Sequence, residues 1–598
     1  MNKISLFLVL FTILLTSCKS EIKKEIVDEE TLNISESFEN LLSDYYKEGL
    51  KFYPIKATFA GESRYNDSFP NFLSDTYKDS VLAYYSKFQK YLKEYDDKQL
   101  SDSEKLSKAI LQWDIDINLE GLKFRKDLIP IDQMWSINLM VGQLASGESA
   151  QPFNTVEDYE NWLKRLEGYT KWLKTAERKM KEGVRIRYVL PNSLIVKVIP
   201  QLKALSNPNV EDHLFFSPVK NFPGSFKAEE KKELTLAYTK MIQDKIIPAY
   251  MSLHKYVSTD YLNSGRTSSG IDAIPSGKEY YQFAIKKYTT TDLNAEEIHQ
   301  IGLGEVSRIL LEMEKVKAEV EYEGDLISFF DFVRNNKSLM PYSKPEEILK
   351  NFNSIHNRMK PNLNRLFANK PKTAFIVKQT EDFREESASA EYNPGSLDGK
   401  RPGIFYVPIP DASRYNVYAD ESLFLHEAIP GHHYQISLTQ ENEELPDFRK
   451  TLWYSAYGEG WALYTESLGK ELGLYTDPYQ YFGTLSSEMH RAIRLVVDTG
   501  LHAKGWTREK AIQYSLENEA EPEASIISEI ERYMANPGQA LSYKIGQIKI
   551  QKLRKKAESQ LGDKFDIKEF HNQILETGCI PLALLEYKID NWIELLAL

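Results

Sequence analysis

The sequence predicts a mainly α-helical protein with a small β-sheet close to a cluster of histidines. Long stretches repeat apolar residues at intervals of three and four, which is the pattern of amphipathic helices. Patterns typical of strands are confined to two short stretches that directly precede the histidines. The chain of 598 residues, 42% of them hydrophobic, is long enough for a large core. These observations together favour one large helical unit.

Charge and cysteine content narrow the classes of function. The formal net charge of −12 argues against a nucleic-acid partner, because phosphate contacts need a basic face. The two cysteines are Cys18 and Cys579. We therefore expect neither disulfide bonds nor cysteine ligands to a metal.

Residues 1–18 have the pattern of a signal peptide. Lys3 precedes an apolar run from Ile4 to Leu15, which is too short to span a membrane. The segment Leu15-Thr16-Ser17-Cys18 resembles the bacterial lipobox, where a peptidase cuts before a cysteine that is then acylated. The resemblance implies an exported lipoprotein that is anchored to a membrane by acyl chains on Cys18. A cleaved signal peptide with an incidental cysteine is the alternative.

The residues after Cys18 define the expected location and domains. Lys19, and not aspartate, follows the cysteine, so we expect the outer membrane in a cell that has one. Residues 19–35 are charged and poor in aromatic side chains, as in a flexible tether. No Gly/Ser-rich linker follows, so residues 36–598 are predicted to form one catalytic domain. Two lobes that meet near residue 290 are a variant of this prediction.

The clearest helices and strands can be placed by their periodicity. Helices are expected at 36–54, 158–183 and 295–320, where Pro or Gly marks the ends. The strand-like stretches are Thr373 to Gln379 and Gly403 to Pro410. Both come just before the histidine cluster, so the small sheet is expected beside the site.

The stretch Leu425 to His433, LHEAIPGHH, resembles a zinc-binding His-Glu-x-x-His motif with altered spacing. In a regular helix His426 and His432 would face about 120° apart and could not share an ion. Pro430 cannot donate a hydrogen bond to the preceding turn, and Gly431 tolerates unusual backbone angles. We expect this pair to widen one helical turn and return His432 to the face of His426. His433, about 10.5 Å further along the helix axis, is the alternative ligand.

A zinc hydrolase needs a third ligand and a base beside the attacking water. Glu427, adjacent to His426, is the expected base. Glu459 lies in an apolar segment where a carboxylate is costly unless it is paired or binds a metal, so it is the expected third ligand. Glu466 either orients a ligand histidine through a hydrogen bond or is a solvated helix residue. The sequence thus predicts one Zn²⁺ ion.

Further residues are candidates for contact with a substrate. His502 either donates to the oxyanion of a tetrahedral intermediate or caps its helix. Arg494 and Asp498, four residues apart, are expected to pair. Tyr533 and Tyr543, on either side of the Asn536-Pro537-Gly538 turn, are the phenols expected at the oxyanion. Arg532 or Lys544 is expected to bind a substrate carboxylate, and Arg491 is a further candidate for contact with substrate.

Four motifs in order resemble one known family. They are His426 to Gln435, Glu459 to Glu466, Val497 to Trp506, and Glu531 to Gly546. Together they resemble the family called domain of unknown function 885. The resemblance implies a large helical metallopeptidase-like fold with a deep cleft. It also implies membership of a group of zinc metallopeptidases with glutamate as the third ligand, which agrees with the ligands expected above.

The predicted function is zinc-dependent hydrolysis of short peptides, of carboxypeptidase or oligopeptidase type. Glu427 would take a proton from the attacking water and pass it to the leaving amine. One alternative is a catalytically inactive surface binding lipoprotein. Another is a zinc hydrolase that acts on non-peptide amides or esters, because the groups that activate water would be the same.

Overall fold

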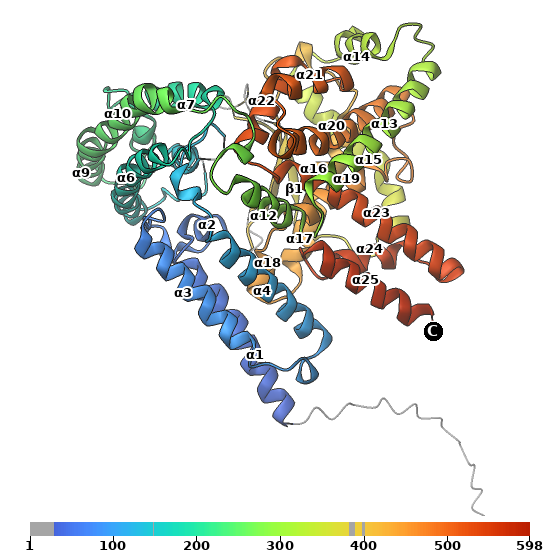
Figure 1. Cartoon of the computed structure of the whole chain (residues 1–598), viewed down its shortest axis with the longest axis horizontal. Helices are drawn as coiled ribbons and strands as arrows, with labels where there is room; N and C mark the ends of the chain where they lie inside the picture. The colour runs from blue at the N-terminus through green and yellow to red at the C-terminus, as the bar shows by residue number, and fades with distance from the viewer. Residues whose placement is uncertain are drawn as a thin grey trace, which may run out of the picture.

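The computed structural model describes residues 29–134, 136–147, 149–381, 385, 389–397 and 401–597. It confirms the mainly α-helical fold with one small sheet (Figure 1). The predicted signal peptide and Cys18 lie outside the described residues. In the part of the chain that the structure describes, no helix is long and apolar enough to cross a membrane.

The N-terminal half is a series of helices. In Figure 1, α1, α3 and α4 form an arm at the lower left, and α6 to α10 lie above it. The helices of this half are α1 (Glu29–Leu50), α2 (Pro54–Phe59), α3 (Asp75–Leu92), α4 (Asp102–Gly121), α5 (Ile137–Ala145), α6 (Val156–Arg185), α7 (Asn192–Ala204), α8 (Ser217–Lys220), α9 (Ala228–Met241), α10 (Ile247–Tyr256), α11 (Leu262–Ser264), α12 (Gly277–Thr289) and α13 (Ala295–Glu319). The helices expected at 158–183 and 295–320 are confirmed as α6 and α13. Helix α1 begins seven residues before position 36, so the last part of the expected tether is helical.

The C-terminal half carries the histidine cluster. Its elements gather on the right of Figure 1. They are α14 (Leu326–Asn335), α15 (Pro345–Leu366), α16 (Asp420–Glu427), α17 (His432–Glu441), α18 (Asp447–Lys450), α19 (Ser455–Glu466), α20 (Pro478–Ala503), α21 (Arg508–Asn518), α22 (Glu523–Ala535), the 3-10 helix η10 (Gln539–Leu541), α23 (Ser542–Leu561), α24 (Ile567–Leu575) and α25 (Leu582–Ala597).

The sheet has three strands in the order β1-β3-β2. Strands β1 (Phe375–Gln379) and β3 (Gly403–Val407) lie where the sequence predicts them and pair in parallel. The short β2 (Glu391–Asn393), which the sequence did not reveal, pairs antiparallel with β3. Helix α15 packs against both β1 and α16. It therefore connects the sheet to the first helix of the histidine cluster.

Two hydrophobic cores stabilise these helices. Each core takes buried residues from both sides of residue 290, so that position is not a boundary between them. Helices α19 and α23 approach closely because glycines face each other. A Cβ atom on Gly460 would lie 2.5 Å from the Gly546 backbone, and one on Gly546 would lie 1.8 Å from the Ala456 carbonyl oxygen. This close contact fixes α19, the helix that carries Glu459.

Candidate metal centre

The histidine motif lies on two helices and not on one. Helix α16 ends at Glu427 and α17 begins at His432, so the expected widened turn within a continuous helix is wrong. Instead, a cis Ile429–Pro430 peptide and Gly431 connect two separate helices. A Cβ atom on Gly431 would lie 1.9 Å from the carbonyl oxygen of His426 and 2.3 Å from that of Leu425. Only glycine permits the chain to turn back so closely onto the end of α16.

Helix α19 holds this turn in place. Trp461 Nε1 donates a hydrogen bond to the Pro430 carbonyl over 2.9 Å, and Thr465 Oγ1 donates to the Leu425 carbonyl over 2.9 Å. Carbonyl groups at a helix end and in a buried turn need such partners. The helix that carries Glu459 is therefore attached to the turn between the two histidines.

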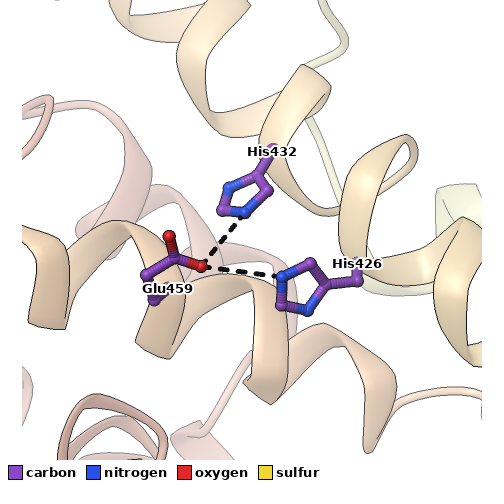
Figure 2. Close-up of side chains that lie close together, drawn as sticks. All are labelled: His426, His432 and Glu459. Carbon is purple, nitrogen blue, oxygen red and sulfur yellow. Dashed lines mark ion pairs between the residues drawn. The ribbon is translucent and has the colours of Figure 1, made fainter. Parts of the chain in front are cut away.

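The side chains of His426, His432 and Glu459 point toward one another (Figure 2). Glu459 Oε2 lies 3.6 Å from His426 Nε2 and 3.3 Å from His432 Nε2, and one ligand atom from each residue fits within 4.8 Å. Ligand atoms about 2.1 Å from a tetrahedral zinc ion lie about 3.4 Å from one another. Two imidazole nitrogens and one carboxylate oxygen are also a donor set that zinc prefers. The three residues fit a zinc ion.

Glu466 orients the first histidine. Its Oε1 lies 2.7 Å from His426 Nδ1, and its Oε2 accepts a hydrogen bond of 2.6 Å from Ser422 Oγ. Glu466 is buried, so the solvated alternative is wrong. A proton held on Nδ1 by this carboxylate leaves the lone pair of Nε2 free, which is how histidine ligands are commonly prepared for a metal.

The pKa values reflect burial and the clustered charges. Burial lowers the pKa of His426, but hydrogen bonds with Glu459 and Glu466 outweigh it and raise that pKa to about 9. Burial raises the pKa of Glu459, but His432 and His426 lower it more, and it ends well below its usual range. Glu427 is buried beside them, and burial raises its pKa. A raised pKa suits a carboxylate that accepts and releases a proton near neutral pH.

His433, the alternative ligand, faces away from Glu459. Its Nδ1 lies 2.9 Å from the Tyr392 hydroxyl of β2, and its ring centroid lies 4.7 Å from that of Phe375 in β1. Burial lowers its pKa to about 4. His433 therefore joins α17 to the sheet. Of the two alternative histidines, His432 is the one that converges with His426 and Glu459.

Two of the residues expected to contact substrate lie near the three converging groups. Arg491, on α20, is close enough for its charge to act on the carboxyl groups of Glu427 and Glu466, although burial is the largest influence on the pKa of both. Its Nε is buried and has no hydrogen-bond partner among the described residues. Tyr543, on α23, is close enough to Glu459 for that carboxylate, after burial, to raise the pKa of its phenol. Both remain candidates for contact with a substrate.

The cationic candidates of α22 and α23 are engaged elsewhere. Lys544 Nζ contacts Glu488 at 2.6 Å, Glu305 at 2.9 Å and Gln547 at 2.7 Å, which uses all three donors. Arg532 donates through Nε and Nη2 to Glu529, over 2.8 Å each, and through Nη1 to Gln539. Other side chains therefore hold both cations in this structure, and the assignment of either one to a substrate carboxylate stays a prediction.

Tyr533 is engaged within the same region. Its hydroxyl accepts from Arg494 Nε over 3.0 Å and donates to Glu529 over 2.8 Å, so it has no proton left for an oxyanion. Arg494 contacts Glu529 at 2.9 Å, and the expected pair with Asp498 is wrong. Asp498 instead accepts from the Tyr281 hydroxyl.

His502 has a structural role. Its Nδ1 accepts a hydrogen bond of 2.9 Å from the Ile271 amide, and its Nε2 lies 3.0 Å from the Tyr533 carbonyl oxygen. Both ring nitrogens are thus bound by backbone groups, and burial lowers the pKa of His502 to about 3. Neither expected role, oxyanion donor or helix cap, agrees with these contacts.

Sequence reasoning missed two residues of this region. Glu529 binds Arg532 and Tyr533 three and four residues further along its own helix α22, and it also binds Arg494 of α20. The spacing within α22 was available from the sequence, but the contact with Arg494 was not. Trp453 was seen only as part of an apolar segment. Its side chain is 45% exposed, and its ring centroid lies 5.8 Å from that of His432. The sequence carried no signal for this position, because the exposure of Trp453 and its contact with His432 are properties of the folded chain.

Comparisons with known proteins agree with this fold. The family described as "Bacterial protein of unknown function (DUF885)" matches residues 54–589. A crystal structure described as "the putative lipoprotein from Colwellia psychrerythraea" is 28% identical, with a TM-score of 0.86 over 94% of this chain and 99% of that one. A protein from Shewanella oneidensis, described as a "putative lipoprotein of unknown function", is 19% identical, with a TM-score of 0.73 over 92% of this chain and 99% of that one. The chain matches no curated protein sequence.

Proposed function

This chain belongs to the DUF885 family of bacterial proteins, whose function is unknown, so its activity must be inferred from the site itself. We propose that it is a zinc-dependent hydrolase that cleaves short peptides. The observation that carries the proposal is the convergence of His426 Nε2, His432 Nε2 and Glu459 Oε2. Two histidines and one carboxylate leave a fourth tetrahedral position for water or substrate.

The charges of the site support a divalent cation. The carboxylates of Glu427, Glu459 and Glu466 lie around two imidazoles, and Arg491 is the cation whose charge reaches two of them. When both imidazoles are neutral, as metal ligands must be, three negative charges and one positive charge leave an excess of two. Buried charges are costly unless they are compensated, and Zn²⁺ compensates two.

The residues of the chain have separate tasks in the proposed reaction. Bound zinc supplies Lewis acidity, which makes water a nucleophile at neutral pH. Glu427 takes the proton of the attacking water on its carboxylate and then gives it to the leaving amine. Tyr543 donates a hydrogen bond to the carbonyl oxygen under attack. Arg491 binds a polar group of the substrate through its unpartnered Nε.

The test combines metal analysis with peptide cleavage. Purified protein is analysed for zinc by mass spectrometry and incubated with a mixed peptide pool, whose products reveal exo- or endo-cleavage. We expect about one zinc ion per chain. Glu427→Gln should keep the zinc and lose hydrolysis by at least about 100-fold, the usual contribution of a general base. His426→Ala should lose the zinc.

Matched controls separate these effects from general damage. Glu443→Gln changes an exposed glutamate of the same region, and His254→Ala changes a histidine of α10; both should behave as wild type. Undiminished cleavage by Glu427→Gln would disprove the base assignment. Zinc without turnover would favour the binding lipoprotein, and cleavage of amides or esters alone would favour the non-peptide hydrolase.

The proposed location rests on the N-terminal sequence and on one relative. Cys18 follows a lipobox-like segment, and the 28% identical relative is described as a lipoprotein. We propose that Cys18 is acylated and holds the protein at the cell envelope, on the outer membrane where one exists. Fractionation and mass spectrometry of the N-terminal peptide test this. Cys18→Ser should release a chain without acyl groups.

A further inference from the structure

A cavity of about 350 Å³ lies between the two halves of the chain. Its lining residues come from the segments 126–132, 188–190, 266–271 and 534–537 and from α12. Three of its lining residues are the tyrosines Tyr188, Tyr280 and Tyr288. The volume is in the range of sites that bind small ligands.

Lys126 is the notable cation of this cavity. It is exposed to the cavity, and its Nζ lies 5.4 Å from the ring centroid of Tyr280. Among the described residues, no carboxylate lies within 4.0 Å of it. The protein treats its other enclosed lysines differently: Lys179 contacts Asp75 and Asp127, and Lys544 contacts two glutamates. Lys126 thus has the Tyr280 hydroxyl as a hydrogen-bond partner, with Asp132 near it, but no carboxylate in ion-pair contact among the described residues.

The other charged groups of the cavity leave its surface positive. Arg266 hydrogen-bonds to backbone carbonyls, among them those of Val189 and Gly270, and it forms no ion pair within 4.0 Å with a carboxylate in the part of the chain that the structure describes. Asp132 is the one acidic residue of the lining, and its Oδ1 accepts a hydrogen bond from the Met134 amide. Two cations and one carboxylate leave one positive charge, which favours a negatively charged ligand.

Lys287 adds positive charge beside the cavity. Its Nζ lies 5.6 Å from the ring centroid of Tyr288, which lines the cavity. It has no carboxylate within 4.0 Å among the residues that the structure describes. Two neighbouring positive charges repel each other. A carboxylate that binds between them removes this repulsion, so the pair favours a carboxylate ligand.

The cavity is linked along the chain to the helix that carries Tyr543. Tyr288 donates a hydrogen bond of 3.0 Å to Asn536, and Asn536 and Pro537 form part of the lining. The chain then passes through η10 directly into α23, where Tyr543 lies near Glu459. One short segment therefore lines the cavity and also carries a candidate for contact with the scissile bond.

We propose that this cavity binds a carboxylate of the peptide substrate through Lys126. The inference rests on the proposed function and names its substrate class: peptides that carry a negative charge. The carboxylate belongs either to the C-terminus of the peptide or to an aspartate or glutamate side chain. A charge-assisted hydrogen bond to Lys126 supplies the specificity in both cases.

The test measures binding separately from cleavage. Full-length Glu427→Gln protein is loaded with zinc and incubated with three tripeptide pools. The first has neutral side chains and a C-terminal amide, the second has the same side chains and a free C-terminus, and the third has an amide and one acidic residue. Retained peptides are quantified by mass spectrometry. We expect at least about tenfold tighter binding of one charged pool than of the neutral pool.

Two variants assign the effect to the cavity. Lys126→Gln, made in the Glu427→Gln protein, should abolish the preference for the charged pool, while Lys123→Gln, an exposed neighbour, should keep it. The preferred pool tells which carboxylate binds. Equal retention of all pools, no retention of any pool, or an unchanged preference in Lys126→Gln would overturn the inference. A charged-pool preference without cleavage by wild-type protein would leave the cavity assignment intact and refute the hydrolase.

Discussion

Two buried charge clusters lie close together in the C-terminal half, and they are balanced in different ways. The Glu459 cluster has the carboxylates of Glu427, Glu459 and Glu466 around two histidines. The second, the Glu529 cluster, has two carboxylates, two guanidinium groups and one histidine: Glu519, Glu529, Arg494, Arg532 and His490. The second cluster neutralises itself, whereas the first retains an excess of negative charge.

The difference indicates which cluster is structural and which can bind a cation. Two arginines and a tyrosine share the Glu529 carboxylate, so a ligand would find its groups occupied. In the Glu459 cluster, by contrast, the imidazole nitrogens converge on one carboxylate oxygen with no guanidinium within ion-pair distance among the described residues. Burial with an uncompensated charge is tolerated where a metal supplies the compensation.

Asp498 adds a third way to neutralise a buried carboxyl. It is fully buried, and it accepts hydrogen bonds from the Tyr281 hydroxyl and the Gly538 amide. Burial raises its pKa to about 7. We therefore expect these neighbouring carboxyl groups to be neutralised in three ways: by zinc, by arginine and by a proton. Each of the three can be tested by a different substitution.

The largest effect is expected for Glu459→Gln. Loss of a partner outside the ligand set commonly weakens metal binding 10–100-fold, so loss of a direct ligand should weaken it by more than about 100-fold and abolish hydrolysis. The measurement is zinc affinity in competition with a chromophoric chelator. The metal-free variant should be less stable than metal-free wild type, because the imidazoles of His426 and His432 lose the carboxylate that holds them in the metal-free state. Unchanged zinc affinity would contradict the ligand assignment.

Glu529→Gln should produce the opposite pattern. Removal of this carboxylate leaves Arg494 and Arg532 buried with too few anions, and such losses cost about 3–5 kcal/mol. Urea unfolding followed by circular dichroism measures the change. The folded variant should still bind one zinc ion. Glu509→Gln is the control, since Glu509 is 74% exposed and contacts Arg508 only at 3.4 Å, so its loss should cost less than about 1 kcal/mol.

Asp498→Asn should change the pH dependence of stability. The folded pKa of about 7 lies above the unfolded value near 3.9, so the folded state holds the proton more tightly. Stability from this group is present at acid pH and is lost as pH rises toward 7, by about 2 kcal/mol between pH 5 and 7. The asparagine does not titrate. Urea unfolding in chelator at pH 5, 6 and 7 should give curves for the two proteins that converge or cross; parallel curves would refute the assignment.

The sequence predicted those features of the fold and the site that depend on local patterns of residues. Helical periodicity located α6 and α13, and the residue types around LHEAIPGHH identified the three groups that converge in the structure. It could not predict that Pro430 and Gly431 separate two helices, because the turn depends on contacts with Trp461 and Thr465 of another helix. The spacing was therefore interpreted as a distortion within one helix.

The substrate contacts were predicted less well, for a physical reason. Arg532, Tyr533 and Lys544 are predicted because they lie near the Asn536-Pro537-Gly538 turn, and His502 because it lies near a helix end. Lys544 is held by Glu305 and Glu488, and His502 by backbone groups of Ile271 and Tyr533, all distant in the chain. Glu529, by contrast, holds Arg532 from the preceding turn of the same helix. Whether a buried polar group is free or engaged is a property of the packed structure, and a sequence motif does not encode it.

The smallest effect is expected for Glu466→Gln, which distinguishes orientation of a ligand from ligation. Glu466 contacts His426 Nδ1 but no other member of the converging group, so its loss should weaken zinc binding about 10–100-fold and leave one ion bound at high zinc concentration. Ser422→Ala keeps the carboxylate and removes one of its hydrogen bonds, so its effect should be smaller. A purely structural role would instead lower the free energy of unfolding of both metal-free variants while their zinc affinity stayed at the wild-type value.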